Sequence, residues 1–143
     1  MKNTYLNIYN NLIKLTRNKS LFYKINNNES FSDRMVIFLL HFAFFLKMYK
    51  NDNSKYKLQN VYDYVFKQLE ISIRELGYGD MSVNKKMKSY INLFHSIILK
   101  VEKWNNFNVD KKCLIFKELI NDEIDSLYFV NYFDKYRLFL RNN

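Results

Sequence analysis

The sequence predicts an all-α protein that folds as a compact single domain, and three observations support this fold class. The chain has 143 residues, which is the usual size of one domain. It has no proline and only two glycines, so it lacks the turn residues that β-hairpins and sandwiches need. Hydrophobic residues make up 48% of the chain, which is enough for one core. We therefore expect residues 1–143 to form one bundle of about five to six helices.

The first 20 residues have the pattern of an amphipathic helix. Its basic residues Lys14, Arg17 and Lys19 come at the end, where positive charge suits the helix dipole. The segment is polar and interrupted, without the apolar stretch and cleavage site of a secretory signal. A short targeting helix, or a helix that lies on a membrane surface, is the alternative interpretation. The apolar positions are Tyr5, Ile8, Tyr9, Leu12, Ile13 and Leu15.

Residues 34–49 form the most apolar stretch of the chain. The uncharged part from Met35 to Leu46 has twelve residues and includes His41. A membrane-spanning helix needs about 20 apolar residues, so this stretch is too short. A helix that is apolar on nearly every side is typical of the centre of a bundle. We expect it to be the central helix, covered by its neighbours.

Residues 58–76 place their apolar side chains three and four positions apart, which predicts a third helix. Gly77 follows as the expected left-handed residue that ends this helix. Arg74 lies in the last turn, where it complements the helix dipole. A glycine turn is therefore expected between the third and fourth helices, with Gly79 in a tight turn.

A fourth helix is predicted over residues 81–104, with Asp80 or Ser82 as its N-cap and Val83 in the core. Two more helices follow, one capped by Asp110 and one after a break at residues 121–125. Further apolar contacts are expected from the last helix, through Leu127, Phe129, Val130, Phe133, Tyr136, Leu138 and Leu140.

Three lysines stand near the predicted start of the fourth helix: Lys85, Lys86 and Lys88. Positive charge at a helix start is disfavoured by the dipole, at up to roughly 1 kcal/mol per residue. No packing argument requires these lysines, so we interpret them as a contact surface for a partner.

The net charge of +9 also points to an anionic partner. It is concentrated before the tail, since residues 105–143 hold six Lys or Arg and six Asp or Glu. RNA, a lipid surface and an acidic protein all remain candidate partners at this stage. Cys113 is the single cysteine and cannot form an internal disulfide, which suits a reducing compartment.

Catalysis has little support in the sequence. His41 and His95 lie in apolar runs on different helices, without the Cys or spaced carboxylates of a zinc or di-iron site. No glycine-rich phosphate loop and no nucleophile elbow is present. We interpret both histidines as buried and hydrogen-bonded, and expect no enzyme activity and no cofactor. A small enzyme or haem carrier that uses His41 or His95 is the alternative.

Three short motifs carry a resemblance to a known family. "DRM" at residues 33–35, "LLH" at residues 39–41 and "RELGYGDMSVNKKMK" at residues 74–88 are similar to the ubiquinol-cytochrome c chaperone family. Tyr78 and Met81 depart mildly from its pattern, since aliphatic residues are usual there, and Asn84 replaces a common glycine. The resemblance maps the family motif onto Arg34, Leu40, His41, Arg74, Glu75, Gly77, Gly79, Asp80, Val83, Lys85, Lys86 and Lys88.

The resemblance implies an all-helical assembly chaperone that helps newly made cytochrome b into the cytochrome bc1 complex. It implies cytochrome b or another assembly factor as the partner, and no small-molecule substrate. The chain resembles the short bacterial members, which implies a place in the cytoplasm, at the inner face of the membrane. A ribosome- or RNA-binding module and a peripheral membrane adaptor are the alternatives that the basic charge leaves open.

Within this motif we expect two groups of residues. Arg74, Lys85, Lys86 and Lys88 are the expected partner-binding residues, and for the three lysines the reason is that folding does not need their charge. The others are expected to support the structure, with Arg34 paired to Glu75 or Asp80 across the bundle. This structural group consists of Arg34, His41, Glu75, Gly77, Gly79, Asp80 and Val83.

Overall fold

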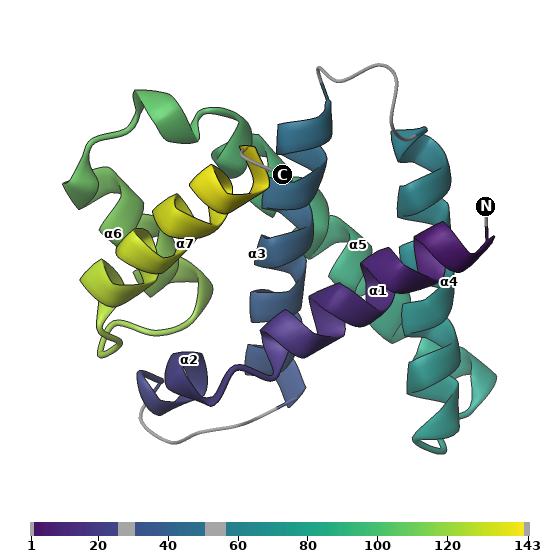
Figure 1. The fold of residues 1–143 in the computed structure, drawn as a ribbon. Coiled ribbons are helices and arrows are strands. Elements are labelled where there is room, and N and C mark those ends of the chain that lie inside the picture. Colours follow the sequence, from purple (N-terminus) through teal and green to yellow (C-terminus); the bar gives the residue numbers. More distant parts are fainter. Residues whose placement is uncertain (1, 26–30, 51–56, 142–143) are drawn as a thin grey trace.

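A computed structural model describes residues 2–25, 31–50 and 57–141, and these residues form helices joined by short connections (Figure 1). The all-α fold class predicted from the sequence is confirmed, and no strand occurs in these three ranges. In chain order the elements are α1 (Lys2–Thr16), α2 (Lys19–Tyr23), α3 (Phe31–Tyr49), α4 (Leu58–Glu75), α5 (Asp80–Glu102), the 3-10 helix η1 (Trp104–Asn106), α6 (Val109–Leu119) and α7 (Ser126–Arg141).

Helix α3 is the centre of the bundle, as its sequence predicts. Every residue from Met35 to Phe45 is buried, so this part of the helix has no solvent-facing side. Figure 1 shows α1 crossing α3, with α6 and α7 on one side of it and α4 on the other. Among the described residues, no helix combines the length and the apolar character that crossing a membrane requires.

Aromatic side chains enclose α3 on its α4–α5 side. The ring of Phe42 stacks on that of Phe94 from α5, with centroids 5.2 Å apart. Phe66 of α4 contacts Phe94 edge to face at 5.3 Å and lies 6.2 Å from Phe42. These rings join three helices that are far apart in the sequence.

A second aromatic cluster lies on the other side of α3, because residues 42 and 44 are roughly 200° apart around a helix. The ring of Phe44 stacks on that of Phe133 from α7, with centroids 5.2 Å apart. The indole of Trp104 contacts the ring of Phe44 edge to face, also with centroids 5.2 Å apart. Phe116 of α6 lies 5.6 Å from both Phe133 and Trp104. Helices α6 and α7 are thus attached to α3 through this second cluster.

Polar contacts fix the ends of these helices. The indole nitrogen of Trp104 donates a hydrogen bond of 2.8 Å to Asp134 of α7. Lys47, near the end of α3, donates to the backbone oxygens of Val101 at 2.9 Å and Glu102 at 3.2 Å. A lysine at the last carbonyls of α5 satisfies orphan acceptors and complements the negative end of the helix dipole.

The structure differs from the sequence-based expectation at several helix boundaries. The short helix α2 was not expected, so the glycine turn lies between the fourth and fifth helices, α4 and α5, instead of the third and fourth. Helix α5 begins at Asp80, one residue before the predicted segment, and Trp104 belongs to η1. The N-cap of α6 is Asn108 and not Asp110, because the Asn108 side chain accepts the backbone N–H of Lys111. In the last helix, Leu127 and Leu138 are exposed, whereas Phe129, Val130, Phe133, Tyr136 and Leu140 are buried as expected.

Replacing Phe44 by alanine should lower the free energy of unfolding by about 3–5 kcal/mol, because the buried ring leaves a cavity between α3, η1 and α7. Urea denaturation followed by circular dichroism measures this loss. Leu99→Ala is the control: Leu99 is exposed on α5, and its truncation should change stability by less than about 0.5 kcal/mol. Equal losses in the two variants would contradict the assignment of α3 as the organising helix.

Candidate partner-binding site

The motif residues of 74–88 come together where α4 ends and α5 begins. Leu76 is the C-cap of α4, and Gly77 follows with φ of 99°, the left-handed conformation predicted for it. The backbone N–H of Gly77 donates to the oxygen of Arg74 at 3.0 Å, which closes the last turn. A side chain at Gly77 would be strained by this backbone conformation.

Gly79 and Asp80 differ from their predicted roles. Gly79 is the N-cap of α5 with φ of −72° and ψ of 167°, an extended conformation that any residue adopts. Nothing lies within 4 Å of a side chain added there, so neither a tight turn nor a close approach requires glycine. Asp80 was expected as the N-cap, but it is the first residue of the helix, where its negative charge suits the dipole.

Arg74 uses its charge inside the turn. It donates a hydrogen bond to the carboxylate of Asp80 and forms an ion pair with Glu70 one turn earlier at 3.7 Å. The hydrogen bond to Asp80 raises the pKa of the Arg74 guanidinium. Within the described ranges, Arg34 pairs with neither Glu75 nor Asp80, so that expected link across the bundle is absent. The partner-binding role of Arg74 stays a prediction, and two carboxylates already compensate its charge.

The three lysines lie on and beside the solvent-facing side of α5. Lys85 and Lys88 are exposed, and Lys86 is half-buried with its ammonium group 4.7 Å from the ring centroid of Tyr78. No carboxylate of the described residues forms an ion pair with any of the three. Since α5 starts at Asp80, the lysines lie beyond its first turn, and the dipole cost is smaller than the sequence suggested.

Three apolar side chains are exposed beside these lysines. Met81 is 88% exposed, Leu76 is 61% exposed and Tyr78 is 45% exposed. We call Leu76, Tyr78, Met81, Lys85, Lys86 and Lys88 the hairpin tip. The apolar half of this surface was not predicted from the sequence. The available signal was Tyr78, a large side chain in a turn whose residues are usually small and polar, with Met81 following at the start of α5.

An apolar groove runs beside the tip, between α1, α3 and the end of α4. Its volume is about 280 Å³, and none of the described residues that line it is Asp or Glu. Phe38, Leu69 and Ile73 form its buried apolar wall, and Leu76 belongs both to the groove and to the hairpin tip. The exposed side chains of Arg17 and Arg34 also line it. The groove combines segments from three parts of the chain, so no sequence motif could have indicated it.

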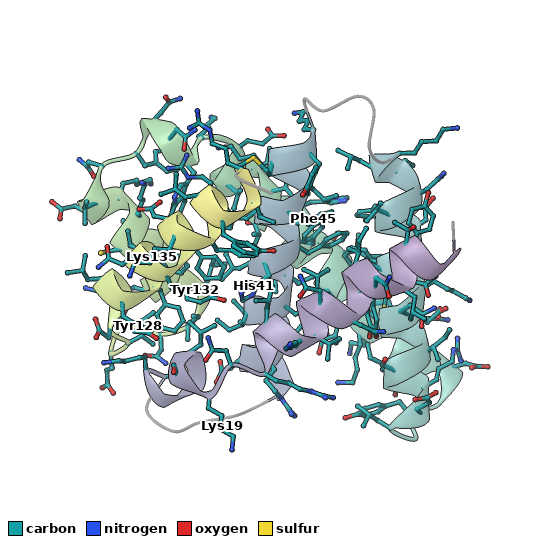
Figure 2. All side chains as sticks on the ribbon, viewed as in Figure 1. Lys19, His41, Phe45, Tyr128, Tyr132 and Lys135 are labelled. Carbon is teal, nitrogen blue, oxygen red and sulfur yellow. The ribbon has the colours of Figure 1, made fainter. Side chains whose placement is uncertain are left out.

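His41 is buried and hydrogen-bonded, as predicted. Its Nδ1 lies 2.8 Å from the backbone oxygen of Ile37, which can only accept, so Nδ1 carries the proton. Its Nε2 then accepts a hydrogen bond of 2.6 Å from the hydroxyl of Tyr132 on α7. Figure 2 shows His41 and Tyr132 next to each other between α3 and α7. Burial lowers the pKa of His41 to about 4 and raises the pKa of Tyr132 to about 12.

These contacts bear on the alternative of a haem carrier. Both ring nitrogens of His41 already have partners, so His41 could ligate a metal only after breaking its bond to Tyr132. His95 was predicted to be buried but is exposed, with Nε2 3.4 Å from the hydroxyl of Tyr62. The described part of the chain holds no group of three His, Cys, Asp or Glu side chains placed to bind a metal ion.

The remaining two residues of the predicted structural group are Val83 and Glu75. Val83 is buried as expected, and Glu75 is exposed.

A helical bundle that exposes apolar and cationic side chains together is typical of a domain that binds other proteins. The comparison with known families agrees with this class. A model of the ubiquinol-cytochrome C chaperone family matches residues 24–110, and the chain belongs to this family. No curated protein and no solved structure matches the chain. The matched range contains α3, α4 and α5, and therefore the hairpin tip.

The stability of the protein should fall between pH 6.5 and pH 4 because of His41. The unfolded chain takes up a proton on this histidine below pH 6.5, whereas the folded chain resists it down to about pH 4. The contribution is fully present above pH 6.5, and about 3 kcal/mol is lost on acidification. Urea denaturation of the wild type and of His41→Gln at pH 7 and pH 4 measures this loss. The difference in free energy of unfolding between the two proteins should be about 3 kcal/mol smaller at pH 4 than at pH 7. A difference that does not change with pH would contradict the assignment.

The same substitution should have opposite effects at the two glycines of the turn. Gly77→Ser should lower the free energy of unfolding by about 1 kcal/mol, because serine disfavours the left-handed conformation. Gly79→Ser should raise it by a few tenths of a kcal/mol, since a serine N-cap can accept a first-turn amide hydrogen. Thermal melting of both variants decides this, and equal losses at both positions would count against the two backbone conformations.

Proposed function

We propose that this protein is a non-enzymatic assembly chaperone that acts during biogenesis of the cytochrome bc1 complex. Its partner is newly made cytochrome b or an assembly factor that accompanies it, and the hairpin tip is its contact surface. Membership of the ubiquinol-cytochrome C chaperone family supports the role. The observation that carries the proposal is the tip itself, where three exposed apolar side chains lie beside three lysines that form no ion pair with the described carboxylates.

The chemistry of the tip suits a client that is apolar and carries exposed acidic or other anionic groups. Leu76 and Met81 offer apolar area whose removal from water favours association. Lysines without a partner steer an anionic surface toward the tip over distances of about 8 Å in physiological salt. Folding alone does not account for these lysines, because Lys85 and Lys88 are three residues apart on α5 and repel each other.

This role locates the protein at the cytoplasmic face of the inner membrane in a bacterium, where cytochrome b is inserted. Contact with the membrane surface itself, and with the ribosome that makes the client, would both fit the basic charge of the chain. The tip would then hold an emerging client segment until it joins its complex. No reaction and no small-molecule substrate belong to this proposal.

Reversing the three lysines to glutamate (Lys85→Glu, Lys86→Glu and Lys88→Glu together) should abolish capture of newly made cytochrome b. The charges that attract the client would repel it, whereas the fold should persist because Lys85 and Lys88 are exposed. Cytochrome b made by cell-free translation in the presence of lipid nanodiscs, followed by a pull-down with the tagged protein, measures capture. Circular dichroism and melting verify the fold.

The matched control reverses three lysines elsewhere: Lys19 on α2, Lys111 on α6 and Lys135 on α7, all exposed. This variant has the same net charge and should capture cytochrome b as the wild type does. Equal loss in both variants would show a general charge effect and contradict the tip. A different outcome is that the wild type does not bind cytochrome b but binds random RNA with an affinity that falls steeply with salt. The protein would then be a nucleic-acid binder, and the proposal would fail.

A further inference from the structure

The groove between α1, α3 and α4 has an interior that offers almost no free hydrogen-bonding group. The hydroxyl of Tyr9 and that of Ser72 lie 3.2 Å apart and bond to each other across the groove. The Ser72 hydroxyl also donates to the oxygen of Gln68 at 3.0 Å. Thr16 is buried and donates to the oxygen of Leu12 at 2.8 Å. An occupant with many polar groups would lose its own hydrogen bonds to water there, so the occupant must be mainly apolar.

Two cations at this groove set the charge of the occupant. Arg17 follows α1 and Arg34 lies in the first turns of α3, and both side chains are exposed and line the groove. No carboxylate of the described residues forms an ion pair with either of them. Free guanidinium groups bind carboxylates through paired hydrogen bonds. The groove therefore complements an apolar body that carries an acidic group.

The shape of the groove suits the side chains of a helix. Its volume of about 280 Å³ accommodates a few inserted apolar side chains. Its α4 wall presents Leu69, Ile73 and Leu76 at spacings of four and three, a row of roughly 10 Å along the helix. An amphipathic helix with apolar residues at matching intervals lies naturally along such a row.

Leu76 makes the groove continuous with the hairpin tip, since it belongs to both. We propose that the groove docks an amphipathic helical segment of a partner protein, with its apolar side chains against Leu69, Ile73 and Leu76. An Asp or Glu of the same segment binds Arg17 and Arg34. The inference rests on the proposed function in one respect, that the ligand is a protein. It adds a second contact region with a further requirement, because the bound segment must be helical as well as acidic.

The experiment selects binders from a phage-displayed library of helical peptides of about 16 residues, roughly 24 Å long, with one face randomised. The target is the full chain, immobilised in its folded form. The enriched peptides should place apolar residues at i, i+3 or i+4, and i+7, with an Asp or Glu within one turn of them. A representative peptide is then synthesised with a fluorescent label, and its affinity is measured by anisotropy.

Two variants and two matched controls locate the binding. Arg17→Glu with Arg34→Glu should weaken the peptide by about tenfold or more, because like charges then oppose it. Ser72→Trp should block the groove with a bulky side chain. Lys135→Glu with Arg141→Glu changes the net charge equally on α7, and Ser96→Trp adds the same indole at an exposed position of α5. Both controls should bind like the wild type, and circular dichroism verifies that all four variants are folded.

The proposal is overturned if the library yields no binders, if the enriched peptides lack acidic residues, or if the groove variants bind them as well as the controls do. Flotation with vesicles that contain phosphatidylglycerol identifies the competing source of anionic apolar ligands. Vesicle binding that the arginine reversal abolishes, without peptide enrichment, would assign the groove to lipid instead. The selection contains no cytochrome b, so its failure leaves capture by the hairpin tip intact, and loss of capture leaves the selection intact.

Discussion

The complete burial of α3 is the constraint on which the rest of this fold depends. A helix without a polar face is stable in water only if neighbours surround it, and here α1, α5 and α7 pack directly on α3, with Phe66 of α4 reaching Phe42. Phe42 and Phe44 point to opposite sides of the helix, so two separate aromatic clusters form, one toward α4 and α5 and the other toward η1 and α7. Helix α6 completes the second cluster through Phe116, which packs on Phe133 of α7 and on Trp104. The hairpin of α4 and α5 extends past the end of the enclosed region, and its last apolar residues have nothing to pack against.

The parts of the fold that depend on local chemistry could be predicted from the sequence. The spacing of apolar residues identifies the long helices, and Gly77 marks the end of α4 because few other residues adopt its conformation. Prediction failed where a tertiary contact decides between local options. Asp80 has the chemistry of an N-cap, yet Gly79 is the N-cap, and Asp80 is the first helical residue and pairs with Arg74. His95 stands in an apolar run beside buried Phe94, but the next position on a helix is rotated by about 100°, which takes His95 to the solvent side.

The candidate site divides in the same way. The lysines of the hairpin tip were identified because positive charge there lacks a folding explanation, whereas the exposure of Leu76 and Met81 depends on how far the hairpin extends beyond its neighbours. The groove could not be predicted from the sequence, since its walls come from three separate segments, residues 9–17, 34–38 and 69–76. Arg34 illustrates the limit: its charge suggested an ion pair across the bundle, and only the assembled structure shows it lining a groove without an acidic neighbour among the described residues.

The contact between His41 and Tyr132 means that the segment matched by the family model and the folding unit have different boundaries. The family match ends at residue 110, yet the imidazole of His41 is completed by a hydroxyl from α7, and Trp104 by the carboxylate of Asp134. A fragment that stops at residue 110 would leave both of these partners missing and would open the Phe44 side of α3 to water. Helix α7 is therefore part of the folding unit although it lies outside the matched range, because it supplies a hydroxyl, an acid and an aromatic face at those three points.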